Sequence, residues 1–118
     1  MRNPAHSTAA ALKELPKAAG SKLVVVKYDA SVWQSAFDST KELTETHGID
    51  HVDIVVANAG IAKAYPLVKE VTREGILEHV EVNVLGPVSL YQAMRPLLEK
   101  SSSKPIFAIM GSGAGALG

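Results

Sequence analysis

The chain has 118 residues, of which 47% are hydrophobic, so it is long enough for one small domain with a packed core. Its twelve basic and twelve acidic residues cancel, and only 5% of the residues are aromatic, which argues against a nucleic-acid or anionic-lipid surface. The sequence contains no cysteine, and its four histidines match no metal-binding spacing, so we expect no metal site. No apolar run reaches the roughly 18 residues of a membrane span, and we expect a cytoplasmic protein with no membrane contact.

The first third of the chain predicts a helix, a strand and a second helix. Asn3 is placed as an N-cap, Pro4 suits the first helical turn, and Pro16 stops that helix. Residues 22–28 ("KLVVVKY") are rich in β-branched side chains and predict a buried strand. A capping box of Ser31 and Gln34 then begins a helix that Gly48 ends.

The remainder predicts two more strands joined by a long helical segment. Residues 52–57 and 105–110 are short apolar runs, and the stretch 72–98 between them carries apolar residues at helical spacing. Strands that alternate with helical crossovers pair in parallel, so the sequence predicts an α/β fold with a three-stranded parallel sheet.

Small and polar residues follow each predicted strand. They are Asp29 after the first, Asn58, Ala59 and Gly60 after the second, and Ser112 after the third. Ligands of parallel sheets bind at the carboxyl ends of the strands, where small residues let them approach the backbone. The alternative interpretation is that Asp29 and Gly60 serve only the turns in which they lie.

Asn83 lies inside the long helical pattern, where asparagine is a poor helix former. Pro87 stands four residues later and cannot donate to the carbonyl of Asn83, so the pattern predicts a kink that leaves this carbonyl free for a water molecule. An ordinary join between two helices, with Asn83 as a cap, is the alternative.

Together these motifs resemble the short-chain dehydrogenase/reductase family. The matching stretches are "YDA", "VVANAG", "EVNVLGP" and "IFAIMGSGAG". The resemblance implies a partial doubly wound, Rossmann-like sheet over residues 1–118. It also implies that Asp29 contacts the adenine, that Asn58, Ala59 and Gly60 border the cofactor, and that Asn83 and Ser112 are catalytic, holding a relay water and orienting the substrate carbonyl.

Two longer stretches, "RNPAHSTAAALKELPKAAGSKLVVVKYDA" and "NAGIAKAYPLV", are similar to the fungal norsolorinic acid ketoreductase branch of that family. This similarity implies NADPH as cofactor and an aromatic polyketide ketone or a similar small carbonyl compound as substrate. Arg2 matches the arginine that meets the 2′-phosphate of NADP in such relatives, and guanidinium suits phosphate chemically. A solvated terminal arginine is the alternative.

Two other motifs mislead. Gly113, Gly115 and Gly118 have the spacing of a dinucleotide fingerprint, but no helix or downstream acidic residue follows them. Tyr65 and Lys69 have the spacing of the family's catalytic pair, but Pro66 disfavours the helical turn that this pair requires, and the pair precedes Ser112.

We therefore expect a piece of a reductase, truncated at both ends, that lacks the glycine-rich cofactor loop and the Tyr–Lys pair and is inactive alone. The alternative function is a non-catalytic module that pairs with a full-length reductase subunit, with homo-oligomers formed through residues 72–98. An unrelated three-stranded α/β ligand-binding domain would leave the spacing of Asn83 and Pro87 unexplained.

Overall fold

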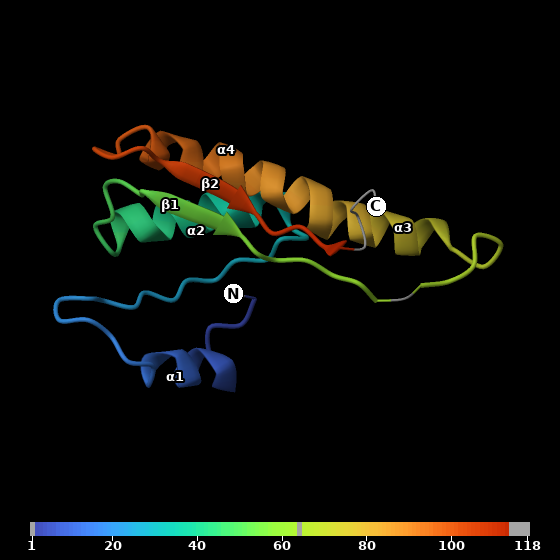
Figure 1. Cartoon of the computed structure of the whole chain (residues 1–118), viewed down its shortest axis with the longest axis horizontal. Helices are drawn as coiled ribbons and strands as arrows, with labels where there is room; N and C mark the ends of the chain where they lie inside the picture. The colour runs from blue at the N-terminus through green and yellow to red at the C-terminus, as the bar shows by residue number, and fades with distance from the viewer. Residues whose placement is uncertain (1, 64, 114–118) are drawn as a thin grey trace.

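The computed structural model describes residues 2–63 and 65–113. Helices and two strands follow one another in the order of an α/β fold, which confirms the predicted fold class (Figure 1). The elements are α1 (Ser7–Lys13), α2 (Trp33–Glu45), β1 (Ile54–Ala57), α3 (Arg73–Val80), the π-helix η1 (Glu81–Leu85), α4 (Gly86–Leu98) and β2 (Ile106–Ile109).

The two strands lie side by side and run in parallel, as predicted for residues 52–57 and 105–110. Ile54 is in register with Ile106, and Ala57 is in register with Ile109. The crossover between them consists of α3, η1 and α4, which is the long helical connection that parallel pairing requires.

The strand predicted at residues 22–28 is wrong, because the structure has no strand there. The three valines of this segment are half-buried, and Tyr28 packs against the core. A run of β-branched residues favours extended backbone, but a strand also requires a hydrogen-bonded ladder to a neighbour, and the described sheet pairs only β1 with β2. The described sheet therefore has two strands instead of three.

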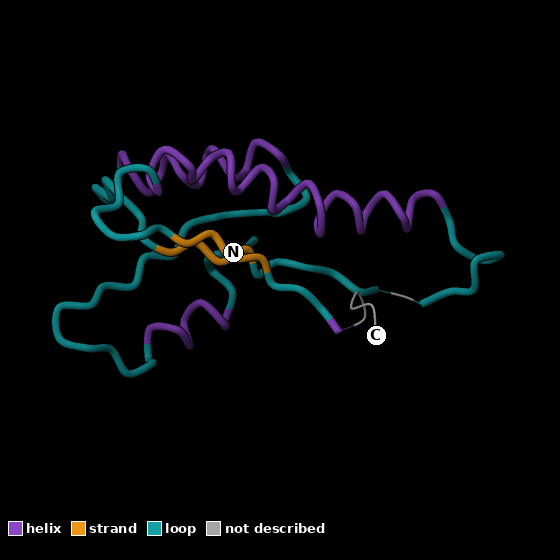
Figure 2. Tube along the Cα trace, turned by 45° about the horizontal axis from the view of Figure 1, so that its top comes forward, coloured by secondary structure: helices purple, strands orange, loops and turns teal. Residues whose placement is uncertain are grey.

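The core lies on one face of the sheet, beneath α2 and α4, whereas α1 lies on the opposite side (Figure 2). Val55 and Ala57 are buried there, while the alternate residues Ile54 and Val56 are 60% and 51% exposed. The strands were predicted to be buried, and in β1 this holds for one face only. Helix α4 supplies the rest of the buried cluster, namely Leu90, Met94, Leu97 and Leu98.

The predicted capping box is also wrong. Val32 is the N-cap residue of α2 and makes no side-chain cap, because Ser31 turns back and donates to Asp29 instead. Asn3 is likewise not the N-cap of α1, since its side chain accepts from the amide of Ala5 in a turn before the helix.

Candidate functional site

The π-helix η1 is centred on Asn83. The amide of Gly86 donates to the carbonyl of Glu81, five residues earlier, instead of the residue four positions back. Pro87 has no N–H to offer the carbonyl of Asn83, so the regular helical ladder cannot continue through this point. The local break expected in the helix at Asn83 is present and takes the form of a π-helix.

The side chain of Asn83 holds the chain that follows β1. Its Oδ1 accepts from the amide of Ile61 at 2.8 Å, and its Nδ2 donates to the carbonyl of Ile61 at 2.9 Å. A Cβ built on Gly60 would lie 3.5 Å from the same Oδ1. Asn83 therefore lies directly against Gly60, the last residue of the Asn-Ala-Gly stretch.

A cavity of about 320 Å³ brings together four residues predicted to contact a cofactor. Arg2, Asp29, Ala59 and Gly60 line it, although they come from three separate parts of the sequence. Asn58 follows β1 directly but is exposed and is not among the lining residues. The cavity therefore joins the ends of segment 22–29 and β1, where the sequence predicted a ligand.

Asp29 is held as a carboxylate on the wall of this cavity. The hydroxyl of Ser31 donates to its Oδ1 at 2.7 Å and the amide of Ser31 donates to the same oxygen at 3.0 Å. These two bonds, helped by the positive charges of Arg2 and Lys27, lower the pKa of the Asp29 carboxyl. An ionised Asp29 can accept hydrogen bonds from an amino group or a hydroxyl.

Tyr28 lines the cavity and is bonded to the first residue of α4. Its hydroxyl donates to the carbonyl of Gly86 at 3.3 Å, and Ser89 donates to the same carbonyl at 2.9 Å. Burial raises the pKa of the Tyr28 phenol; the neighbouring Ser89 hydroxyl opposes this rise, and the Asp29 carboxylate adds to it. Tyr28 was not predicted as a site residue, and its position directly before Asp29 was the signal available.

Gly86 allows α4 to approach the backbone of Ala30 closely. A Cβ at position 86 would lie 2.9 Å from the carbonyl oxygen of Ala30 and 3.1 Å from its Cβ. A glycine is therefore needed here for close packing of the helix against Ala30, which is itself buried.

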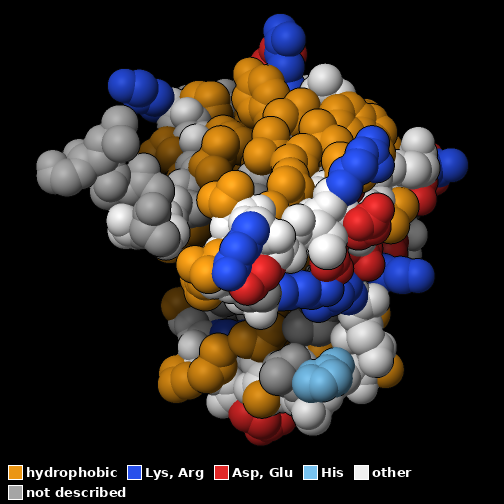
Figure 3. All heavy atoms as spheres, turned by 90° about the vertical axis from the view of Figure 1, so that its right-hand side faces the viewer, with side chains coloured by type: hydrophobic (Ala, Val, Ile, Leu, Met, Phe, Trp, Pro, Cys, Tyr) orange, Lys and Arg blue, Asp and Glu red, His pale blue; other side chains and the backbone are white. Residues whose placement is uncertain are grey.

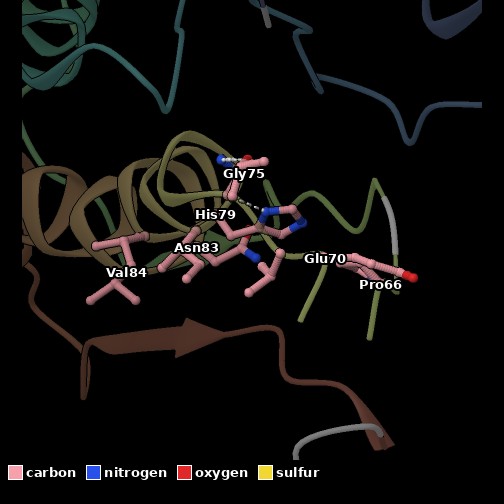
Figure 4. Close-up of a pocket in the computed structure, with 10 residues that line it drawn as sticks. Pro66, Glu70, Gly75, His79, Asn83 and Val84 are labelled. Atoms are coloured by element: carbon pink, nitrogen blue, oxygen red, sulfur yellow. Dashed lines mark hydrogen bonds between the residues drawn. The ribbon is translucent and has the colours of Figure 1, made fainter. Parts of the chain in front are cut away.

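Asn83 also lines a second cavity, of about 600 Å³ (Figure 4). Its apolar walls come from α3 and η1 (Ile76, Val80 and Val84) and from the loop before them (Pro66 and Val71), and its polar lining residues are Glu70, Thr72, His79 and Asn83. The imidazole Nδ1 of His79 lies 2.7 Å from the carbonyl of Gly75, which is drawn as a dashed line in Figure 4.

Two further residues, Lys63 and Glu78, line the smaller cavity and form an ion pair. Nothing in the local sequence indicated this pair, because its members lie fifteen positions apart with no motif between them.

Ser112 is exposed and lies three residues beyond the end of β2, as its position in the sequence predicted. Tyr65 and Lys69 lie in a non-helical stretch, and the Tyr65 side chain is 85% exposed. This confirms that the two do not form the helical turn of a catalytic pair. Of the glycine motif, Gly115 and Gly118 lie outside the described residues.

The family model described as short chain dehydrogenase matches residues 2–118. The chain belongs to this family. Among curated proteins, this short-chain dehydrogenase is 41% identical over 113 residues to norsolorinic acid ketoreductase of Dothistroma septosporum. The match covers 95% of the chain and 42% of the relative, so the chain spans about two fifths of that protein.

Solved structures give the same fold. NADPH-bound carbonyl reductase from chicken fatty liver superposes with a TM-score of 0.74 and 26% identity, over 90% of this chain and 44% of that one. An alcohol dehydrogenase from the archaeon Thermococcus sibiricus, complexed with 5-hydroxy-NADP, superposes with a TM-score of 0.62 and 28% identity, over 71% of this chain and 34% of that one. The doubly wound, Rossmann-like class expected from the sequence is confirmed. Over the part of the chain that the structure describes, no helix has the length and apolar character needed to cross a bilayer.

Proposed function

We propose that residues 1–118 form an NADP-binding unit of a carbonyl reductase and supply its adenine-side wall and part of its catalytic centre. The observation that carries this proposal is the meeting of Arg2, Asp29, Ala59 and Gly60 around one cavity. We further propose that the protein works in the cytoplasm.

The lining of that cavity suits the adenosine end of NADPH. Its volume of about 320 Å³ is near the lower end of ordinary ligand sites. Ala59 and Gly60 present little side chain, the ionised Asp29 accepts hydrogen bonds, and Arg2 offers a planar fork of donors to a phosphate. We assign the 2′-phosphate to Arg2 and the adenine to Asp29, with Asn58 bordering the cofactor beside them.

When bound, NADPH supplies the hydride for carbonyl reduction. In this proposal the carbonyl group of Asn83, which Pro87 cannot bond, holds a water molecule that relays protons. The hydroxyl of Ser112 donates to the substrate carbonyl and orients it. The apolar cavity of about 600 Å³ beside Asn83 favours an aromatic ketone, of the polyketide type or similar, over a charged substrate.

We propose that these residues do not turn over a substrate by themselves. Reduction needs a proton donor near the forming alkoxide, and neither the Asn83 amide nor the Ser112 hydroxyl is acidic enough to serve. Tyr65 is exposed and lies outside any helix that could set it against Lys69.

The second candidate function is a non-catalytic module that pairs with a reductase subunit, or with a second copy, through residues 72–98. The observation that favours it is a row of exposed apolar residues along this stretch. Hydrophobic side chains also gather on the end of the molecule that carries α3 (Figure 3). The row consists of Ile76, Leu77, Val80, Val84, Val88 and Tyr91, which are 37–53% exposed.

Calorimetric titration of the chain with NADPH and NADH tests the cofactor assignment. We expect tighter binding of NADPH, and a loss of about tenfold in NADPH affinity in Arg2→Ala, because a charge-assisted bond to phosphate is removed. NADH affinity should stay unchanged in that variant. Arg73→Ala, which removes an arginine outside the cavity, is the matched control. Equal affinity for both cofactors in the unmodified chain would contradict the assignment.

A further inference from the structure

The segment 61–63 lies along the helix and is bonded to it by two side chains one turn apart. Asn83 exchanges two hydrogen bonds with the backbone of Ile61, and the amide of Lys63 donates to Nε2 of His79 at 3.3 Å. Alternate residues of an extended segment are about 6.6 Å apart, and helix positions four apart are about 6 Å apart. The helix side chains therefore take the place that a neighbouring strand would have.

The hydrogen bonds of His79 fix which ring nitrogen carries the proton. Its Nδ1 faces the carbonyl of Gly75 at 2.7 Å, and a carbonyl can only accept, so Nδ1 is the donor. The neutral ring then has its lone pair on Nε2, and this lone pair accepts from the amide of Lys63. The Gly75 carbonyl thus holds the imidazole in the tautomer that can bind the segment, as Figure 4 shows for the Nδ1 bond.

The same segment borders the proposed cofactor cavity. Ile61 and Lys63 line it together with Ala59 and Gly60, and the Nζ of Lys63 pairs with Glu78, the neighbour of His79. A movement of Lys63 away from the helix would therefore change the wall against which the cofactor is proposed to lie.

We propose that His79 is a positioning residue for cofactor binding. By accepting from Lys63 in its Nδ1–H tautomer, it fixes the segment that follows Gly60 against α3, one turn from the bonds made by Asn83. The expected effect of His79 on NADPH binding rests on the proposed function, whereas its expected effect on segment 61–63 does not.

Nuclear magnetic resonance of the ¹⁵N-labelled chain without cofactor tests the effect on the segment. We expect the nitrogen shifts of His79 to report the Nδ1–H tautomer. In His79→Ala, the amide of Lys63 should exchange with solvent about fivefold faster, because one hydrogen bond is lost. His79→Gln should restore slow exchange, since its amide oxygen can accept in place of Nε2. If His79→Ala fails to fold, His79→Leu keeps the volume without an acceptor.

Titration of the same samples with NADPH tests the effect on the cofactor. We expect about fivefold weaker binding in His79→Ala and near-normal binding in His79→Gln. His51→Ala is the matched control, since His51 is exposed, pairs with Asp50 and lies outside the cavity.

The two readouts separate failure of the inference from failure of the proposed function. An Nε2–H tautomer, or unchanged exchange at Lys63 in His79→Ala, would overturn the inference. Faster exchange with unchanged NADPH affinity would overturn the positioning role. An unmodified chain without NADPH affinity would contradict the proposed function, while the exchange rates would still decide whether His79 holds the segment.

Discussion

Gly86 and Ala30 lie so close together that a methyl group at position 86 would meet the carbonyl oxygen of Ala30 at 2.9 Å. Replacement of a helical glycine by alanine normally stabilises by up to about 1 kcal/mol. Here the contact is with backbone, which cannot rotate away as a flexible side chain could. Overpacking of this kind costs about 1–3 kcal/mol and outweighs the gain in helix propensity. We expect Gly86→Ala to lower the free energy of unfolding, as measured by urea denaturation.

The matched control for that variant is Gly111→Ala. Gly111 is exposed, and a Cβ built on it meets nothing within 4 Å. We expect this substitution to change the free energy of unfolding by less than about 0.5 kcal/mol. Equal effects of the two substitutions would contradict the close-packing role of Gly86.

The bonds between Asn83 and Ile61 predict different outcomes for two variants. Asn83→Ala removes both bonds and should destabilise the chain by about 1–2 kcal/mol. Asn83→Asp keeps an acceptor for the Ile61 amide but places a carboxylate oxygen against the Ile61 carbonyl. We therefore expect Asn83→Asp to be at least as destabilising at neutral pH and to recover in acid, when the new carboxyl can donate. Amide exchange at Ile61 at two pH values provides the measurement.

The carboxyl of Asp29 should titrate differently without Ser31. The hydroxyl and amide of Ser31 are the main causes of its lowered pKa, so Ser31→Ala should raise that pKa toward the ordinary value. Because the pKa of Asp29 is lowered in the folded state, its carboxylate stabilises that state at pH values above the ordinary carboxyl pKa. This stabilisation is lost as the pH falls through the folded-state pKa. In Ser31→Ala, the free energy of unfolding should therefore depend less steeply on pH in the acid range.

Carbon resonances of the side-chain carboxyls, followed against pH, measure this shift. Asp53 is an internal control, because the hydroxyls of Ser101 and Ser103 lower its pKa at a separate place. An unchanged Asp29 pKa in Ser31→Ala would show that the hydroxyl bond does not form in solution.

Thr72 caps α3 and should be sensitive to loss of its hydroxyl. Its Oγ1 accepts from the amide of Gly75 at 3.1 Å. Thr72→Ala should lower the free energy of unfolding by about 1 kcal/mol. Thr72→Ser should change it by only a few tenths of a kcal/mol, because serine keeps the hydroxyl. Thermal unfolding followed by circular dichroism compares the two, and equal melting temperatures would count against the cap.

The sequence was most informative where a local pattern decides local structure. The apolar runs at 52–57 and 105–110, separated by a helical stretch, predicted the parallel pair β1–β2 correctly. The spacing of Asn83 and Pro87 predicted an interruption, because a missing N–H acts on the carbonyl four residues earlier wherever the helix lies.

Prediction failed where the outcome depends on a distant partner. Residues 22–28 have strand-like composition, yet a ladder depends on a neighbour that composition does not reveal. Ser31 is a local case: it could cap a helix or bind Asp29 two residues earlier, and the turn closed by Asp29 forms in place of the cap. The bonds of His79 to Lys63 and Gly75 depend on the path of the loop after β1, for which the sequence offers no periodic pattern.

The π-helix at Glu81–Leu85 lets the crossover hold one residue more than a regular α-helix, while α3 and α4 keep the relative orientation that a regular helix would give them. Each residue of a helix turns it by about 100°, and a π-helix acts as one inserted residue. Deletion of a single residue within 81–85 would allow an uninterrupted α-helix. Because the wide π-helical turn already absorbs the extra residue, α3 would stay close to its present orientation relative to α4 and would not turn by about 100°. A one-codon deletion in the π-helix would therefore leave the two halves of the helix in phase, whereas the same deletion within α3 or α4 would turn one half against the other by about 100°.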